Sequence, residues 1–149
     1  NQYFDQFSRL KHWLEEQKEF IEANAYLYST FGRKRRLENV RSADKGIASH
    51  EVRSGINFLV QSVSSDMNLL AAIDMNNYIK ENGLKSRIFA LVHDSILAEC
   101  PHHEIEAYSK KLEEFVQMDR GIYINGAPVG CDFEIGDDYS MGKYTKMYG

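Results

Sequence analysis

Apolar side chains recur at helical spacing along the first part of the chain, while glutamates and lysines fill most of the positions between them. Residues separated by three, four or seven positions share one side of an α-helix. The pattern therefore predicts an amphipathic helix over residues 3–24. Its apolar positions are Tyr3, Phe7, Leu10, Leu14 and Ile21.

The pattern changes at residues 26–31, which are rich in aromatic and β-branched residues and are followed by Gly32 and a basic cluster. This composition predicts a short β-hairpin whose turn carries Arg33 and Lys34. Residues 1–31 are thus expected to form a helix and a strand, and residues 32–46 a basic turn and a loop.

A second helical region is expected over residues 49–82, within a helical segment at 47–83. Serines at 62, 64 and 65 weaken helix propensity, so an interruption is predicted near residues 61–65. Asn82-Gly83 is a good helix stop. Four apolar residues should face the core: Val52, Ile56, Leu59 and Val63.

Three long polar side chains repeat at every fourth position of the same helix: Arg53, Asn57 and Gln61. At 100° per residue they drift by only ~40° per step, so they share one face, directed away from the apolar positions. The pattern predicts a row of hydrogen-bond donors and acceptors, although an ordinary solvated helix face has the same appearance.

Two apolar β-type runs, at residues 87–92 and 95–99, flank His93 and Asp94. They predict a tight hairpin within residues 84–100. A carboxylate at such a junction is held rigidly, which suits a ligand for Mg²⁺, since this ion requires near-octahedral oxygen coordination. The alternative is that Asp94 only favours the turn.

The remaining residues, 101–149, predict a third helix that opens at Pro101, and one or two strands between 122 and 135 near the turn signals Asn125-Gly126 and Val129-Gly130. The fold class is therefore α+β, with long helices packed on a small antiparallel sheet whose central hairpin carries His93 and Asp94. We expect the 149 residues to form a single partial domain.

Composition is ordinary for a globular protein, with 43% hydrophobic and 27% charged residues, and no apolar run reaches the ~20 residues of a membrane span. A cytoplasmic protein is expected, without membrane contact. The net charge of −4 is unevenly distributed: residues 33–45 hold six basic and two acidic side chains. A local basic surface of this kind can bind phosphates on an acidic protein.

Cys100, His102, His103 and Cys131 raise the alternative of a zinc site. Cys131 stands alone in the sequence, with no second close ligand pair, so a structural zinc site is disfavoured. Cys100 ends an apolar strand, where a small hydrophobic role is expected.

Four short segments, in order, resemble motifs of family A DNA polymerases, the DNA polymerase I type of bacteria and T-odd phages. Residues 91–95 (LVHDS) resemble the third motif of that family, and residues 53–61 (RSGINFLVQ) resemble its Arg-x3-Asn-x3-Gln segment. Residues 32–37 (GRKRRL) are similar to its Gly-Arg-Arg turn, and residues 133–139 (FEIGDDY) to its C-terminal tail. Each motif is short, and their succession is what is specific.

The resemblance implies roles for these residues. Asp94 would bind Mg²⁺ in a two-metal site shared with an upstream aspartate, and His93 would contact the primer terminus. Arg53, Asn57 and Gln61 would lie along the minor groove of primer-template DNA, where acceptors are nearly the same for every base pair. The helices at 47–83 would thus be DNA-contacting helices. The basic cluster would bind DNA phosphates; its members are Arg33, Lys34, Arg35 and Arg36.

Ser95 stands where many relatives carry glutamate after His-Asp, which leaves open whether Asp137, Asp138 or Glu99 substitutes for it. The earlier aspartate motif and the nucleotide-holding fingers helix of the family have no counterpart in these 149 residues. The resemblance therefore predicts the C-terminal, palm-containing part of a phage-like DNA polymerase, and Asn1 in place of Met fits a fragment. Deoxynucleoside triphosphates and an upstream polymerase segment are the expected partners, in the cytoplasm of a bacterial or phage-infected host cell.

Two alternatives from other classes remain. One is a non-catalytic nucleic-acid-binding or assembly module that keeps a palm-like fold. The other is a small metal-dependent hydrolase that uses Asp94 with Asp137 or Asp138. A second carboxylate close to Asp94 within this chain would favour the hydrolase.

Overall fold

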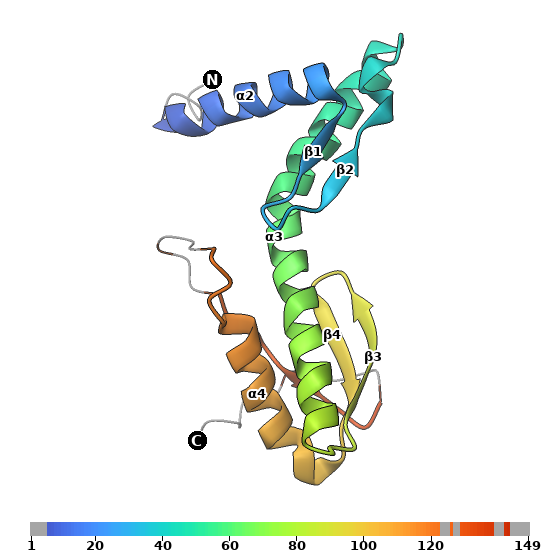
Figure 1. The fold of residues 1–149 in the computed structure, drawn as a ribbon, viewed down its shortest axis with the longest axis vertical. Coiled ribbons are helices and arrows are strands. Elements are labelled where there is room, and N and C mark those ends of the chain that lie inside the picture. Colours follow the sequence, from blue (N-terminus) through green and yellow to red (C-terminus); the bar gives the residue numbers. More distant parts are fainter. Residues whose placement is uncertain (1–5, 123–125, 127–128, 139–141, 144–149) are drawn as a thin grey trace. The chain divides into compact units, whose positions relative to one another are not determined.

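The computed structural model describes residues 6–122, 126, 129–138 and 142–143 (Figure 1). The predicted first helix is present as α2 (Ser8–Asn24), while Tyr3 lies outside the described residues. α2 ends where Ala25 adopts a left-handed φ of 58° and donates its N–H to the Ile21 carbonyl at 2.9 Å. Ile21 is fully buried, whereas Phe7 and Leu10 are exposed. Among the described residues, the predicted apolar face is thus fully buried only at its C-terminal end.

The predicted first hairpin is formed by β1 (Tyr26–Tyr28) and β2 (Lys34–Arg36), paired antiparallel. The turn closes between Ser29 and Arg33, where the Ser29 N–H donates to the Arg33 carbonyl at 2.8 Å and Gly32 has a φ of 83°. Arg33 therefore lies in the turn as predicted. Lys34, in contrast, is the first residue of β2.

α3 (Lys45–Glu81) is a single helix of 37 residues, so the predicted interruption near residues 61–65 is wrong. Serine hydroxyls there bond to carbonyls of the preceding turn, with Ser62 Oγ donating to Leu59 at 3.5 Å and Ser65 Oγ to Ser62 at 3.3 Å. Serine disfavours a helix when its hydroxyl competes for the backbone, and these bonds are compatible with a continuous helix.

Both ends of α3 have a local cause. Asp44 Oδ1 accepts the N–H groups of Gly46 at 2.7 Å and Ile47 at 3.3 Å, which caps the helix start four residues earlier than predicted. The predicted loop at 38–46 accordingly holds a short 3-10 helix, η1 (Glu38–Arg41), and the first residues of α3. At the other end Gly83 has a φ of 63°, and the Leu84 N–H bonds to the Ile79 carbonyl at 3.0 Å, which is a Schellman stop.

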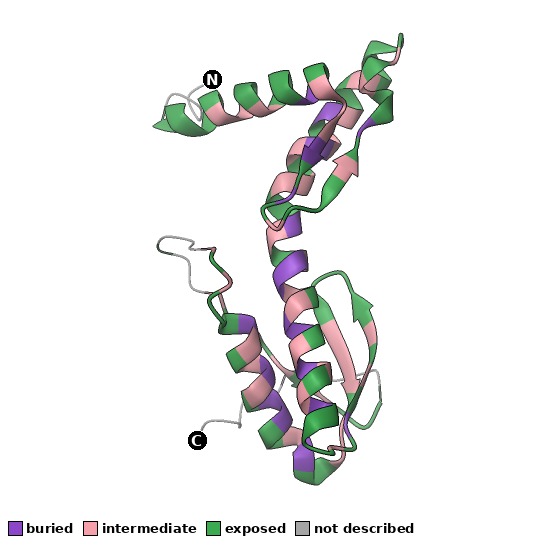
Figure 2. Ribbon diagram, viewed as in Figure 1, coloured by how far each residue is buried: buried purple, intermediate pink, exposed green. Residues whose placement is uncertain are grey.

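The chain divides into two compact units, residues 1–66 and 67–149. The core of the first unit lies between the end of α2, the first hairpin and the N-terminal half of α3 (Figure 2). Its buried residues are Ile21, Leu27, Leu37 and Val52. Ile56 and Leu59 pack against this core, as their spacing predicts.

In the second unit, β3 (Arg87–Val92) and β4 (Ser95–Glu99) form the predicted central hairpin, with a register shift between Ile88 and Ala90. η2 (His102–Glu104) and α4 (Ile105–Gln117) follow. The core lies between α4, this hairpin and the C-terminal half of α3 (Figure 1). Its buried residues are Ala71, Met75, Ile79, Tyr108, Leu112 and Val116.

Near the C-terminus, β5 (Glu134–Ile135) and β6 (Gly142–Lys143) pair antiparallel, while Asn125 of the predicted turn lies outside the described residues. The α+β prediction is confirmed. Within the described residues, however, the strands form three separate two-stranded sheets rather than one small sheet. No helix among the described residues is long and apolar enough to cross a membrane.

Candidate functional site

His93 and Asp94 form the two-residue turn between β3 and β4, since Val92 pairs directly with Ser95. His93 has a φ of 55°, a backbone conformation that glycine adopts more readily and that tight two-residue hairpin turns require. Both side chains are exposed, as is Ser95. The hairpin therefore presents an imidazole, a carboxylate and a hydroxyl together at its tip.

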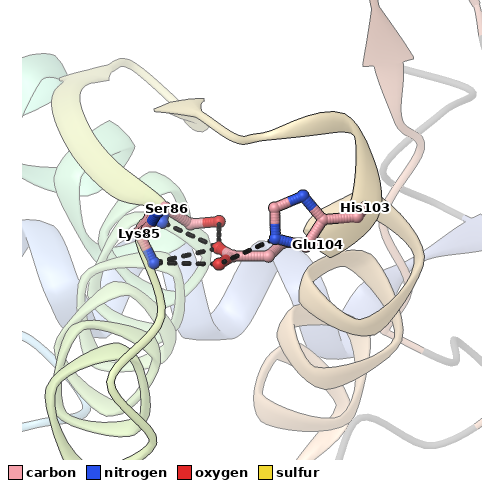
Figure 3. Close-up of polar contacts among 4 residues, drawn as sticks. All are labelled: Lys85, Ser86, His103 and Glu104. Atoms are coloured by element: carbon pink, nitrogen blue, oxygen red, sulfur yellow. Dashed lines mark hydrogen bonds and ion pairs between the residues drawn. The ribbon is translucent and has the colours of Figure 1, made fainter.

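The base of this hairpin is held by Glu104, which lies in η2 with only 9% of its side chain exposed. Its carboxylate accepts the N–H groups of Lys85 at 3.0 and 3.1 Å and of Ser86 at 2.8 Å, and the Ser86 hydroxyl donates to it at 2.6 Å (Figure 3). His103 Nε2 lies 3.7 Å from the same carboxylate. One side chain after β4 thus fastens the two residues before β3.

Hydrogen bonds from the Lys85 backbone and from the Ser86 side chain and backbone hold the pKa of Glu104 below its usual range, and the nearby His103 acts in the same direction. The sequence did not single out Glu104. Its partners lie 18 and 19 residues away, so no local pattern could have revealed them.

Arg87 and Glu99 form a second, exposed clamp across the same strands, at 2.6 and 2.8 Å. Cys100 follows β4 and packs against the core with Cys131. Burial raises the pKa of the Cys100 thiol, and burial raises that of Cys131 to about 11. Both thiols are thus protonated near neutral pH, as expected of small apolar packing residues.

Within the described residues, no three His, Cys, Asp or Glu side chains gather closely enough to hold a metal ion. Cys100, His102, His103 and Cys131 thus do not come together as a metal-binding cluster. Asp137 and Asp138 are exposed and do not complete a three-ligand cluster with Asp94. Asp94 carries a hard oxygen donor of the kind that Mg²⁺ prefers, without a cluster of further ligands among the residues that the structure describes.

The first unit carries a polar groove along α3. Arg53, Asn57 and Gln61 are exposed on one face of the helix and line a hollow of about 310 Å³ together with Arg35 and Phe58. A neighbouring hollow of about 530 Å³ shares Arg35, Phe58 and Gln61 and is lined by the whole basic cluster. We call these two hollows the α3 groove. Four basic side chains thus border the face that the helical spacing predicted.

The members of the basic cluster differ in their contacts. Arg33 forms an ion pair with Asp66 at 2.7 Å, and the Asp66 side chain is only 9% exposed. Arg35 donates to Ser54 Oγ at 2.8 Å. Both guanidinium groups lie 5.2 Å from the centre of the Phe58 ring. Arg33 and Arg35 are therefore anchored to α3 inside the groove, a division within the cluster that the sequence did not reveal.

A search against known protein families matches residues 1–141 to DNA polymerase family A. The DNA polymerase of Escherichia phage T5 is 44% identical over 152 residues, which cover 98% of this chain and 18% of that polymerase. The DNA polymerase of Bacillus phage SP01 is 29% identical, with 92% and 15% covered. The chain thus spans less than a fifth of the length of these relatives.

The thermostable DNA polymerase I of Thermus aquaticus is 26% identical over 95% of this chain and 16% of its own length. Among solved structures, the POL domain of Pol1 from M. smegmatis, in complex with DNA primer-template and dNTP, superposes with a TM-score of 0.69 at 26% identity. This match covers 86% of the chain and 21% of that structure. The family match extends over nearly the whole sequence and agrees with the fold, so this chain belongs to DNA polymerase family A.

Proposed function

We propose that this chain forms part of a DNA-directed DNA polymerase that extends a primer on a template by two-metal nucleotidyl transfer. The observation that carries the proposal is the α3 groove, in which Arg53, Asn57 and Gln61 line one hollow beside four basic side chains. Membership of family A and a solved relative in complex with primer-template and dNTP support it.

The α3 groove is suited to duplex DNA on two counts. Guanidinium groups bind phosphates through charge-assisted hydrogen bonds that do not depend on sequence. Asn57 and Gln61 offer amides to minor-groove acceptors, which occupy nearly the same places in every correct base pair. In this arrangement the basic side chains hold the duplex, and the amides sense whether the pair at the primer end is correctly formed.

Asp94 would supply one carboxylate ligand to Mg²⁺, whose charge, when the ion is bound, favours ionisation of the primer 3′-hydroxyl and offsets charge on the transferred phosphates. His93, next to it, would donate an imidazole N–H to a phosphate or sugar oxygen at the primer terminus. The Glu104 and Arg87 contacts at the base of the hairpin keep these two groups on a fixed support.

A second metal-binding aspartate and a nucleotide-holding helix would come from a polymerase segment outside these residues, because Asp94 has no carboxylate cluster around it in the described part of the chain. Ser95 retains a hydroxyl that can bond a metal-bound water in the place of the glutamate of many relatives. Deoxynucleoside triphosphates would bind to the assembled enzyme rather than to this segment alone.

The proposal is tested in the assembled enzyme with Asp94→Asn, read by primer extension and by DNA affinity. Incorporation should fall to background while the Kd for primer-template stays within a few-fold, since only a metal ligand is lost. Glu106→Gln removes a carboxylate charge from exposed α4 and is the matched control, with extension unchanged. Normal turnover by Asp94→Asn would refute the metal-ligand role.

The same assay tests the groove through Gln61→Ala, for which extension should slow and matched primer ends should lose much of their advantage over mismatched ones. If Gln61→Ala extends both ends like the parent enzyme, the α3 groove does not sense base pairing. A different outcome would favour a non-catalytic binding module: the parent protein binds DNA but extends no primer, and Gln61→Ala weakens that binding.

A further inference from the structure

The first hairpin has a second side, opposite the one that packs on α3, and two residues at its edge, Lys34 and Arg36, also border the larger hollow of the α3 groove. In the antiparallel register Tyr26 lies opposite Arg36 and Tyr28 opposite Lys34, so these four side chains share one side. Leu27 and Arg35 occupy the other side, where Leu27 is buried and Arg35 bonds to Ser54 of α3. We call the side that carries Tyr26, Tyr28, Lys34 and Arg36, together with Phe20 of α2, the outer face.

Aromatic rings on the outer face form a continuous row. Phe20 and Tyr26 meet edge to face with centroids 6.0 Å apart, and Tyr26 and Tyr28 do so at 5.6 Å. Lys34 Nζ lies 4.0 Å from the centre of the Tyr26 ring and 5.7 Å from that of Tyr28. Tyr28 is 50% exposed and Phe20 43% exposed. Both terminal residues of the row are therefore exposed to solvent and accessible to a ligand.

The charge of the outer face is unneutralised. Lys34 and Arg36 are exposed, and neither forms an ion pair with any residue that the structure describes. Arg33, by contrast, is neutralised by Asp66 inside the groove. Cations beside open aromatic rings suit a ligand that offers negative charge and planar groups together.

Single-stranded nucleic acid has this chemistry, because its phosphates are accessible and its unpaired bases can stack on a side-chain ring. In a duplex the bases stack on one another, which leaves only phosphates for such a face. An acidic peptide offers charge without planar groups that would use the open rings. The chemistry of the outer face therefore favours an unpaired strand.

We propose that the outer face binds single-stranded nucleic acid, namely the unpaired template strand that continues beyond the duplex. This inference rests on the proposed function, which places the duplex in the α3 groove on the opposite side of the same hairpin. The hairpin would then contact the paired and unpaired parts of one template with its two faces. Tyr28 would stack on a base, and Lys34 and Arg36 would bind the adjoining phosphates.

The test compares two fluorescein-labelled DNA probes in the assembled enzyme: a blunt hairpin duplex, and the same duplex with an unpaired oligo-dT template extension of about 8 nucleotides, within the site size typical of such proteins. Fluorescence anisotropy gives both affinities, and their ratio measures the gain from the extension. Tyr28→Ala should reduce this gain by about fivefold or more, while Tyr28→Phe, which retains the ring, should preserve it.

Lys34→Ala gives a second measurement that does not depend on the ring. The excess of its salt slope on the extended probe over that on the blunt duplex should be smaller by about 0.7, the value of one phosphate contact on a single strand. Lys110→Ala removes an exposed lysine from α4 and is the charge control, with both affinities unchanged. Blunt-duplex affinity should be unaltered in Tyr28→Ala and Tyr28→Phe, which also shows that these variants remain folded.

An unchanged gain in both Tyr28→Ala and Lys34→Ala would overturn the inference, and so would equal weakening of both probes. A face built for an acidic protein would give the first of these results. Failure of the proposed function has a different signature: Arg53→Ala would leave blunt-duplex binding unchanged, although the gain from the extension could still respond to Tyr28→Ala.

Discussion

His93 occupies a backbone conformation that glycine adopts more readily, at the tip of the central hairpin and beside Asp94. A non-glycine residue in the left-handed region costs on the order of 1–2 kcal/mol. A histidine at this position therefore makes the folded turn less stable than a glycine would. Such strain at an exposed turn is a signature of functional positions.

Two substitutions of His93 distinguish the effect of its backbone strain on stability from the effect of its imidazole on primer extension. His93→Gly should raise the free energy of unfolding by about 1 kcal/mol relative to His93→Ala, because glycine relieves the left-handed strain. If the imidazole contacts the primer terminus, primer extension by the assembled enzyme should nevertheless fall equally in both variants. Recovery of extension in His93→Gly would assign His93 to the turn alone.

Glu104 acts at the residue scale through its hydrogen bonds to Lys85 and Ser86. Its pKa is lowered in the folded protein, so its contribution to stability is present above the pKa of an unfolded glutamate and is lost as the pH falls through the lower, folded value. The hairpin base should therefore keep its stability at neutral pH and loosen only in acid.

Hydrogen exchange of the Lys85 and Ser86 amides measures this dependence. Their protection factors should be high at neutral pH, fall when Glu104 protonates, and be low at every pH in Glu104→Gln, because an amide is a weaker acceptor than a carboxylate. Glu106→Gln in the adjoining α4 is the matched control, since its partner is the exposed Lys110. If protection in Glu104→Gln equals that of the parent, Glu104 does not stabilise the base of the hairpin.

At the scale of elements, Gly55 lets the first hairpin approach α3 closely. A Cβ atom at this position would lie 2.7 Å from Leu37 Cδ1 and 2.9 Å from Ile21 Cδ1, both at the ends of fully buried side chains. The absence of a side chain at Gly55 thus sets the distance between α3 and the core residues that support the basic cluster.

Gly55→Ala should lower the free energy of unfolding of the first unit by about 1–2 kcal/mol, since the cost of overpacking exceeds the gain in helix propensity of up to about 1 kcal/mol. Urea denaturation monitored by Trp13 fluorescence measures the change. Gly46→Ala, in the first turn of the same helix and close only to the Asp44 carboxylate, should stay within about 0.5 kcal/mol of the parent. Equal stability of both variants would contradict the close approach.

At the scale of the whole molecule, several large apolar side chains are exposed on each unit. Phe7, just before α2, and Leu10 of α2 are 50% and 39% exposed, and Phe89 and Leu91 of β3 are 59% and 47% exposed. Apolar surface of this extent on regular elements usually meets another protein surface. It agrees with the proposal that a further polymerase segment packs on this chain and completes the metal site around Asp94.

The chain by itself should therefore bind duplex DNA weakly and show no primer extension. Mixing it with a polypeptide that carries the earlier aspartate motif and the nucleotide-holding helix of the family should restore extension, because the two would bury these apolar faces together. The same mixture made with the Asp94→Asn chain should remain inactive. Template-directed incorporation by the purified chain alone would mean that its active site lies elsewhere.

The sequence by itself determined the local elements and the order of motifs. Helical spacing predicted α2 and the shared face of Arg53, Asn57 and Gln61, and alternating apolar runs predicted the hairpin around Asp94, because these patterns repeat over a few residues. The succession of motifs identified the family, which the comparison over residues 1–141 confirmed.

Only the tertiary structure decided which distant groups meet. Glu104 finds its partners 18 and 19 residues away, Arg33 pairs with Asp66, and Arg120 reaches Asp74 across 46 residues. Register alone placed Arg35 in the groove and Lys34 on the outer face. α3 also continues as one helix past the serines at 62, 64 and 65, where the sequence predicted an interruption. These outcomes depend on packing between segments, whose free energy outweighs local propensity and leaves no periodic trace in the sequence.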